Sequence, residues 1–292
     1  MSYPEDDDEI DHVTNLSIDN RYDKITLFPP NLSRLLITSK HITELPPFPN
    51  SLNYFNCFNT NLTALPELPN SLRTLICENN NKLTLTELPT TLTALTYCGN
   101  DNVTVLPQLS LLTNLAILIC NNNELTTLPE LPNILNTLKC YGNRLTVLSL
   151  NPNLVTLECD HNELTALPEL PQGLTTLYCD YNKLKDLPDL PASLTRLSCR
   201  GNSFSKSTYI KLVEFYRRHN DHVNLTWAQS RIDEIKSDLN TFGVANVGSK
   251  THEVTGNIIK GYLGQGGTKR RKRQRTKRKK TIRKSKKNII HR

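Results

Sequence analysis

Residues Leu154–Gly173 read LVTLECDHNELTALPELPQG, and residues Leu174–Ser193 read LTTLYCDYNKLKDLPDLPAS. Both follow the frame L-x-x-L-x-C-x-x-N-x-L-x-x-L-P-x-L-P-x-x. Such self-similarity at a fixed period of about 20 residues indicates a repeat architecture. The cysteines follow the same period along the chain, at Cys57, Cys77, Cys98, Cys120, Cys140, Cys159, Cys179 and Cys199.

The frame predicts the structure of one repeat. Its L-x-L-x-C segment alternates with a period of two, which predicts a short strand with Leu and Cys pointing inward. The L-P-x-L-P segment predicts an extended return leg, because proline lacks an N–H and fixes φ. The asparagine predicts a turn whose amide bonds to backbone groups of adjacent repeats. These asparagines are Asn123, Asn143, Asn162, Asn182 and Asn202.

At this frame the sequence resembles the leucine-rich repeat family, and the L-P-x-L-P close resembles the short repeats of secreted bacterial effectors. The resemblance implies an α/β solenoid with a parallel concave sheet and an extended, proline-rich convex side. Ten units are expected, of which the one from Leu92 has an extra residue before Cys98 and lacks the second Leu-Pro. The units start at Val13, Leu32, Leu52, Leu72, Leu92, Leu115, Leu135, Leu154, Leu174 and Leu194.

The eight cysteines are predicted to be reduced and buried, because other units have Ile18 or Ile37 at the same inward position. Pairing of cysteines is expected in secreted proteins, and zinc sites need close pairs such as C-x-x-C, which this chain lacks. We therefore expect no metal, no cofactor and no catalytic residue, and a protein that is not an enzyme.

The outward residues of the strands are the expected partner-binding surface, since they form the concave face of such a solenoid. The earlier units expose Tyr54, Asn56, Phe58, Glu78, Ile117, Ile119 and Asn121. The later units are richer in Tyr, Arg and acidic residues, which favours them as the binding site. The candidate residues are Tyr141, Glu158, Asp160, His161, Tyr178, Asp180, Tyr181, Arg196 and Arg200. Ordinary solvated strand residues are the alternative, for His161 in particular.

A small helical cap is expected after the repeats. Residues 209–218 have the spacing of an amphipathic helix, with Ile210, Val213 and Phe215 toward the repeats, and a second helix is expected from Thr226 or Ala228 to Leu239. The exit from the repeats loosely resembles that of effector repeats into a ubiquitin-ligase domain. No cysteine follows Cys199, so no thiolate is present for that chemistry.

Charge divides the chain unevenly. Residues 269–292 hold 15 Lys/Arg and no acid. The formal net charge of +7 is therefore the sum of −8 from residues 1–268 and +15 from residues 269–292. Such a block is expected to be disordered and to attract polyanions without reading sequence. The expected polyanion-binding residues are Lys269, Arg270, Arg271, Lys272, Arg273, Arg275, Lys277, Arg278, Lys279 and Lys280. Tails of this kind are similar to those of proteins from large cytoplasmic DNA viruses.

The predicted organisation is an acidic arm (1–12), a solenoid (13–204), a helical cap (205–242), a linker (243–268) and the basic tail (269–292). The chain starts without a basic or apolar leader, so we expect an intracellular protein, in cytoplasm or nucleus, in a host cell or in a virion. The first hypothesis is a monomeric protein-binding scaffold whose tail sets its location. The alternative is a nucleic-acid- or virion-associated protein tethered through the tail.

Overall fold

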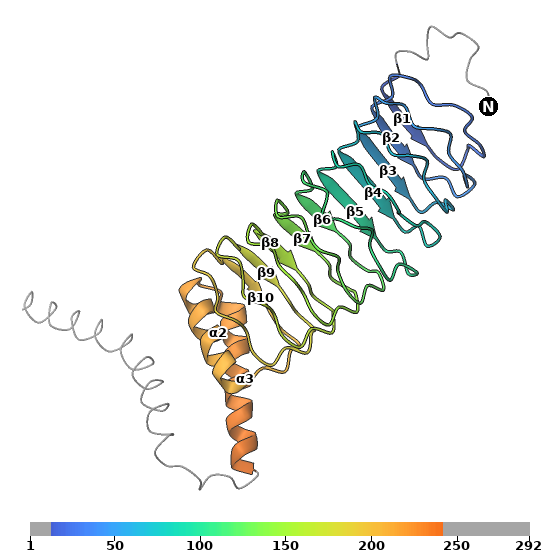
Figure 1. The fold of residues 1–292 in the computed structure, drawn as a ribbon. Helices are drawn as coiled ribbons and strands as arrows, with labels where there is room; N and C mark the ends of the chain where they lie inside the picture. Colours follow the sequence, from blue (N-terminus) through green and yellow to red (C-terminus); the bar gives the residue numbers. More distant parts are fainter. Residues whose placement is uncertain (1–12, 242–292) are drawn as a thin grey trace, which may run out of the picture. The chain divides into compact units, whose positions relative to one another are not determined.

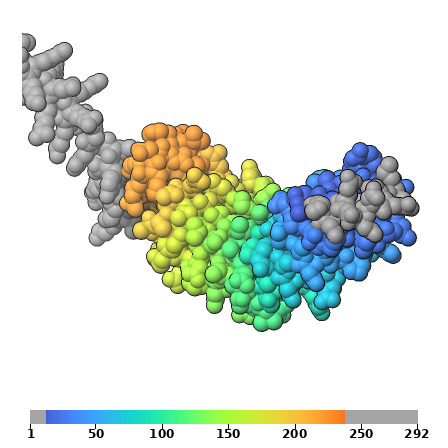
Figure 2. Space-filling view, turned by 90° about the horizontal axis from the view of Figure 1, so that it is seen from above, coloured from blue at the N-terminus to red at the C-terminus, as the bar shows by residue number. Residues whose placement is uncertain are grey.

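A computed structural model describes residues 13–241. Ten short strands form one sheet in which every strand pairs in parallel with its neighbour in the sequence (Figure 1). The strands are β1 (Asn15–Ile18), β2 (Arg34–Ile37), β3 (Tyr54–Phe58), β4 (Thr74–Glu78), β5 (Ala94–Cys98), β6 (Ile117–Ile119), β7 (Thr137–Lys139), β8 (Thr156–Glu158), β9 (Thr176–Tyr178) and β10 (Arg196–Ser198). This is the predicted leucine-rich-repeat solenoid, and Figure 2 shows its coils following one another in sequence order.

The core is a set of leucine rows that run through the stack. Leu157 pairs in register with Leu177, and Leu177 with Leu197, so that equivalent side chains of successive coils lie side by side. Leu157 and Leu177 have no exposed surface, and Leu197 retains 5%. A single coil has no second layer to bury these leucines, and stacking is what makes the core continuous.

The cysteines occupy the next inward position, as predicted. Ile18 pairs with Ile37, Ile37 with Cys57, and Cys57 with Cys77, so isoleucine and cysteine share one column. All eight cysteines are free thiols, and seven of them are buried.

The eighth, Cys98, corrects the prediction. Cys77 pairs with Tyr97 rather than with Cys98, and Tyr97 is the buried side chain of that coil, at 2% exposure. Its hydroxyl donates a hydrogen bond to the Leu83 carbonyl. The unit therefore has no extra residue before Cys98: tyrosine takes the inward position, and Cys98 lies one position later, half-buried on the opposite side.

A ladder of asparagines links the coils beyond the strands. The amide of Asn162 donates to the carbonyls of Cys140 (2.9 Å) and Cys159 (3.2 Å), and its Oδ1 accepts from the Leu145 N–H (2.9 Å). Asn143, Asn182 and Asn202 repeat this pattern. The ladder also extends to Asn80 and Asn100, which the sequence analysis did not include and which are fully buried.

Between the last coil and Thr241, where the described residues end, the chain forms two helices. Helix α2 (Lys206–Arg218) begins after Ser205, whose side chain accepts from the Thr208 N–H and caps the helix. Its buried face consists of Tyr209, Leu212, Val213, Phe215 and Tyr216. Ile210, predicted to face the repeats, is only half-buried, because Tyr209 and Leu212 fill that side. The Tyr216 hydroxyl lies 3.4 Å from Cys199 Sγ, which places α2 against the last coil.

Helix α3 (His222–Thr241) starts earlier than predicted, because Asp221 bonds to the Asn224 N–H and begins the helix there. The chain divides into compact units between Ser230 and Arg231, within this helix. In the second unit, Lys236 pairs with Asp233 (3.1 Å). No helix in residues 13–241 has the length and apolarity needed to cross a membrane.

Candidate partner-binding face

Seven of the nine candidate residues lie on one surface, here named the strand face. It consists of the side chains at the third, fifth and seventh positions of each coil, which alternate with the buried Leu and Cys. The members from the candidate set are Tyr141, Glu158, Asp160, Tyr178, Asp180, Arg196 and Arg200. Arg196 is exposed and the other six are half-buried, so all of them are open to a partner.

His161 and Tyr181 lie elsewhere. Strands β8 and β9 end at Glu158 and Tyr178, and the chain then turns with φ of 52° at His161 and 50° at Tyr181. The period-two alternation therefore stops before these residues, and both belong to the turn beside the strand face. Their rings stack at 4.5 Å, exposed to solvent.

This left-handed turn recurs in most coils and explains several residue choices. The same position has positive φ at Asn59, Asn79, Gly99, Asn122, Gly142 and Gly201. Asparagine and glycine are the residues that adopt this conformation most easily. A Cβ on Gly201 would lie 2.5 Å from the Tyr181 ring, so the aromatic ring also requires glycine there.

Two aspartates on the strand face are held in place by backbone donors. Asp160 Oδ1 accepts from the Asp180 N–H (2.7 Å), and Asp180 Oδ1 accepts from the Arg200 N–H. Asp180 Oδ2 also accepts from the Ser198 hydroxyl (2.7 Å). Asn121 Oδ1 likewise accepts from the Tyr141 N–H. The prediction that Asn121 is exposed was wrong, because this residue is buried. The sheet thus continues as a side-chain ladder past the ends of its later strands.

The electrostatic environment of Asp160 is unusual. Burial raises the pKa of its carboxyl to about 6, and the nearby carboxylates of Asp180 and Glu158 contribute to the rise. The hydrogen bond from Asp180 N–H acts in the opposite direction and is outweighed. Glu158 itself is paired with Lys139 at 2.9 Å.

The neighbouring arginine is directed toward the helices. The Arg200 Nε donates to Asn224 Oδ1 (2.9 Å), and its guanidinium lies 5.6 Å from the centre of the Trp227 ring. Burial acts to raise the pKa of Asp221, but hydrogen bonds from Asn224 and the charge of Arg200 outweigh it and lower that pKa. Arg200, Asn224 and Asp221 therefore form a closed polar group between the last coil and α3.

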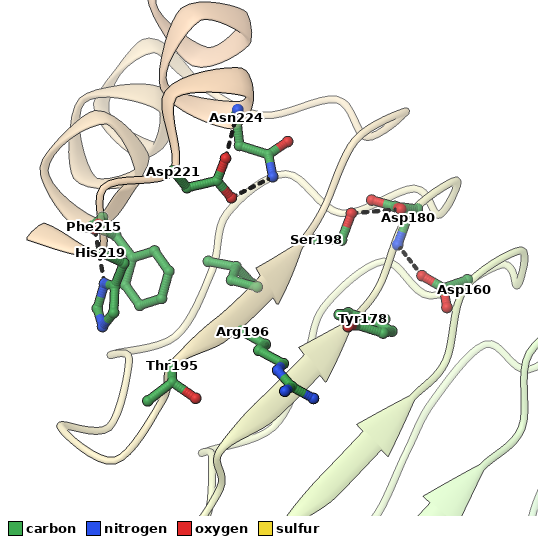
Figure 3. Close-up of a pocket in the computed structure, with 11 residues that line it drawn as sticks. Asp160, Tyr178, Asp180, Thr195, Arg196, Ser198, Phe215, His219, Asp221 and Asn224 are labelled. Atoms are coloured by element: carbon green, nitrogen blue, oxygen red, sulfur yellow. Dashed lines mark hydrogen bonds between the residues drawn. The ribbon is translucent and has the colours of Figure 1, made fainter. Parts of the chain in front are cut away.

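A pocket of about 470 Å³ lies where the strand face meets the helices (Figure 3). Figure 3 shows strand-face side chains on one side of it and helix residues on the other. Its lining residues are Asp160, Tyr178, Asp180, Thr195, Arg196, Leu197, Ser198, Phe215, His219, Asp221 and Asn224. His219 stacks on Phe215 at 4.2 Å, and its Nδ1 lies 2.9 Å from the Phe215 carbonyl oxygen.

Of the pocket residues that follow the last coil, sequence reasoning found Phe215 but missed His219, Asp221 and Asn224. The amphipathic pattern ends at Arg218, one residue before His219, and predicts only a cap over the core. Asp221 and Asn224 follow no repeat, so only the packing of the helices against the last coil brings them to the pocket.

The strand face of the earlier coils is more apolar than that of the later coils. Phe58 and Ile117 retain 39% and 37% exposure, and Tyr54, Ile76 and Ile119 are half-buried beside them. Arg34 lies over the Tyr54 ring, 4.0 Å from its centre.

The side chains of residues 13–241 do not favour a metal site or a reactive thiol. No group of three His, Cys, Asp or Glu side chains in this range has the arrangement of a metal site. Burial raises the pKa of Cys98 to about 11 and that of Cys199 to about 12. Thiols with such values stay protonated at neutral pH and are poor nucleophiles. The predicted polyanion-binding residues of the tail, the acidic arm and the linker lie outside the described residues.

Comparison with known proteins supports the repeat family. No protein-family model matches the chain, and no curated protein matches it. Among solved structures, it is similar to YopM from Yersinia enterocolitica WA-314, at 34% identity and a TM-score of 0.55, over 66% of this chain and 48% of that one. It is also similar to YopM from Yersinia pestis, described as a leucine-rich effector protein, at 32% identity and a TM-score of 0.56, over 66% of this chain and 62% of that one.

The match thus spans less than two thirds of either YopM chain. It agrees with the predicted likeness to short effector repeats. The predicted likeness of the tail to viral proteins is not addressed by these comparisons and stays a prediction.

Proposed function

We propose that this protein is a non-enzymatic scaffold that binds a partner protein through the strand face. The proposal rests on the composition of that face. Half-buried and exposed Tyr, Arg, Asp, Phe and Ile side chains lie on one side of ten paired strands. Tyrosine and arginine are enriched at the energetic centres of protein interfaces. Repeat solenoids present such faces because each coil adds one strand at a fixed spacing.

The centre of the proposed interface is the pocket beside β10. It combines aromatic side chains of Tyr178 and Phe215 with the charged groups of Asp180 and Arg196. A concave site with these residue types accommodates a protruding side chain of a partner, which is the usual geometry of an anchor residue.

The similarity to YopM supports an effector-like role, in which the scaffold brings proteins together in a host cell without chemistry of its own. We propose an intracellular location, in cytoplasm or nucleus. The 15 Lys/Arg of residues 269–292 support a role of the tail in localisation or in attachment to nucleic acid or another anionic surface.

Photo-crosslinking tests the proposal. A crosslinking amino acid is placed in the full chain at Thr137 or Thr156, both on the strand face, and in control chains at Thr146 or Thr165, which are exposed on the return legs of the same two coils. The proposal expects a specific adduct in host-cell lysate from the first pair and none from the second. Adducts that form equally from both pairs, or from the return legs alone, would contradict it.

A further inference from the structure

Along the eight strands β3–β10, the strand face divides into two halves of different chemistry. The coils of β3–β6 provide twelve strand-face positions, of which only Glu78 is charged and only Asn121 is buried. These positions are Tyr54, Asn56, Phe58, Thr74, Ile76, Glu78, Ala94, Thr96, Cys98, Ile117, Ile119 and Asn121. In the coils of β7–β10 the same twelve positions include six charged residues: Lys139, Glu158, Asp160, Asp180, Arg196 and Arg200.

The half over β3–β6, here named the apolar half, exposes apolar side chains to solvent. Phe58 and Ile117 remain exposed, and the half-buried Ile76 and Ile119 belong to the same part of the sheet. Exposed apolar side chains that gather on one surface, rather than occurring singly, mark binding sites for proteins. This half therefore requires apolar side chains from the partner.

The charged half has two carboxylates without a compensating cation. Glu158 is neutralised by Lys139, and Arg200 is directed to Asn224 and Trp227. Among residues 13–241, Asp160 and Asp180 form no ion pair, and the hydrogen bonds they accept come from backbone N–H groups and the Ser198 hydroxyl.

The remaining charge on this half, Arg196, forms no ion pair with either aspartate within the described residues. It occupies the third position of its coil, and Asp160 and Asp180 occupy the seventh. Four residues of extended chain span about 13 Å. The Arg196 guanidinium has no ion-pair partner within the described residues.

On these grounds we propose that the strand face fits a partner segment that crosses the strands, with apolar side chains over β3–β6 and a lysine or arginine at Asp160 and Asp180. This inference rests on the proposed function and specifies its partner. Adjacent strands lie about 4.8 Å apart, so the centres of the two halves, four coils apart, are separated by about 20 Å. An extended segment covers that distance in about six residues.

The raised pKa of Asp160 agrees with this arrangement. The carboxylates of Asp180 and Glu158 add to the effect of burial on its pKa, and no cation opposes them. A lysine or arginine from a partner would supply the missing positive charge and lower that pKa.

Peptide selection tests the proposal. The full chain is used to select from displayed random peptides of about 20 residues, long enough for both halves in an extended form. Selection is repeated with the D160N/D180N variant, in which asparagine Oδ1 still accepts the backbone hydrogen bonds, and with the I76S/I117S variant. The matched control is T146S/T165S on the return legs.

The expected peptides have an apolar cluster and, about six residues away, a lysine or arginine. Replacement of that basic residue by glutamine should weaken binding about tenfold for the original chain and hardly at all for D160N/D180N. I76S/I117S should lose the apolar preference alone, and the control should behave as the original. Circular dichroism confirms that each variant is folded.

The outcomes separate the two proposals. Peptides that depend on Ile76 and Ile117 but have no basic residue, or a basic residue at no fixed distance, would overturn the bipartite partner and leave the scaffold intact. Peptides whose binding none of the strand-face substitutions changes would overturn both.

Discussion

The Asp160 carboxylate accepts a hydrogen bond of 2.7 Å from the backbone N–H of Asp180, one coil further along the solenoid. The contact continues the sheet beyond the last residues of β8 and β9. It also fixes a carboxylate at the edge of the pocket. One residue thus links the stacking of the coils to the chemistry of the proposed interface.

Replacement of Asp160 should separate these two roles. Asp160→Ala leaves the Asp180 N–H without its acceptor and should lower the free energy of unfolding by about 1–2 kcal/mol. Asp160→Asn retains an oxygen acceptor and should cost less, although it removes the charge. Urea unfolding of both variants at pH 7 measures the difference. Equal losses would mean that the hydrogen bond does not stabilise the stack.

The stability of the protein should depend on Asp160 in mildly acidic solution. Its pKa is raised in the folded state from 3.8 to about 6, so the folded protein binds this proton more tightly than the unfolded chain does. The contribution is fully present below about pH 4 and is lost as the pH rises through 6. The ionisable side chains around Asp160 are Glu158, Asp180, Arg196, His219 and Asp221.

Comparison of the original chain with D160N isolates that contribution, because the other groups are common to both. Between pH 4 and pH 6 the original should lose stability relative to D160N. A constant difference across this window would contradict the raised pKa.

The asparagine ladder predicts a large effect from a small substitution. Asn162→Ala removes donors to two carbonyls and the acceptor for the Leu145 N–H, all of them buried, and should cost about 1–3 kcal/mol. Its neighbour Glu163 forms only an exposed ion pair with Lys183, so Glu163→Ala should cost less than about 1 kcal/mol. Similar, negligible effects in urea unfolding would contradict the ladder.

Two glycines, one in a left-handed turn and one outside it, test whether the turn requires glycine. Gly142 has a φ of 66°, and a Cβ there would lie 2.3 Å from Asn122 Oδ1. Gly142→Ala should therefore cost about 1–2 kcal/mol. Around Gly173 a Cβ would meet nothing within 4 Å, so Gly173→Ala should stay within about 0.5 kcal/mol. Thermal unfolding of the two variants would show whether the turn requires glycine.

The cysteines should differ in reactivity according to their position. Cys98, half-buried on the outward side, should react first with a thiol reagent, and the seven buried cysteines should react only after unfolding. Cys159→Ala should cost about 1–2 kcal/mol as a small core truncation. Rapid labelling of several native thiols, or fewer than eight thiols after unfolding without reductant, would contradict the buried column.

The tail prediction depends on charge alone. With about 8 cations engaged on duplex nucleic acid, the slope of log affinity against log salt should be near −7 and independent of sequence. Anisotropy measurements on the full chain and on a 269–292 peptide test this. Retained binding by residues 1–268, or a clear sequence preference, would assign the nucleic-acid binding elsewhere.

The repeat frame predicted the inward and outward rows because burial of leucine alternates with a period of two, which only a strand satisfies. It was wrong at Cys98 because cysteine was used as the marker of the inward position, whereas the larger Tyr97 fills that space with its hydroxyl bonded. His161 and Tyr181 were misplaced because the alternation was extended past the ends of the strands.

The pocket could not be predicted, since it depends on how α2 and the first residues of α3, before Ser230, pack against the last coil. Phe215 was recognised as an apolar helix residue, but no periodic pattern places His219, Asp221 or Asn224 opposite Asp180. Their arrangement follows from tertiary contacts such as Arg200 with Asn224.

Binding of a partner protein at the strand face can be tested directly. The most direct test is calorimetric titration of the partner identified by crosslinking against two double variants of the full chain. T137K/T156K places two long cationic side chains on the strand face, and T146K/T165K places them on the return legs of the same coils. The prediction is a loss of affinity of about tenfold or more for the first and no change for the second. Equal losses, or a loss for T146K/T165K alone, would contradict it.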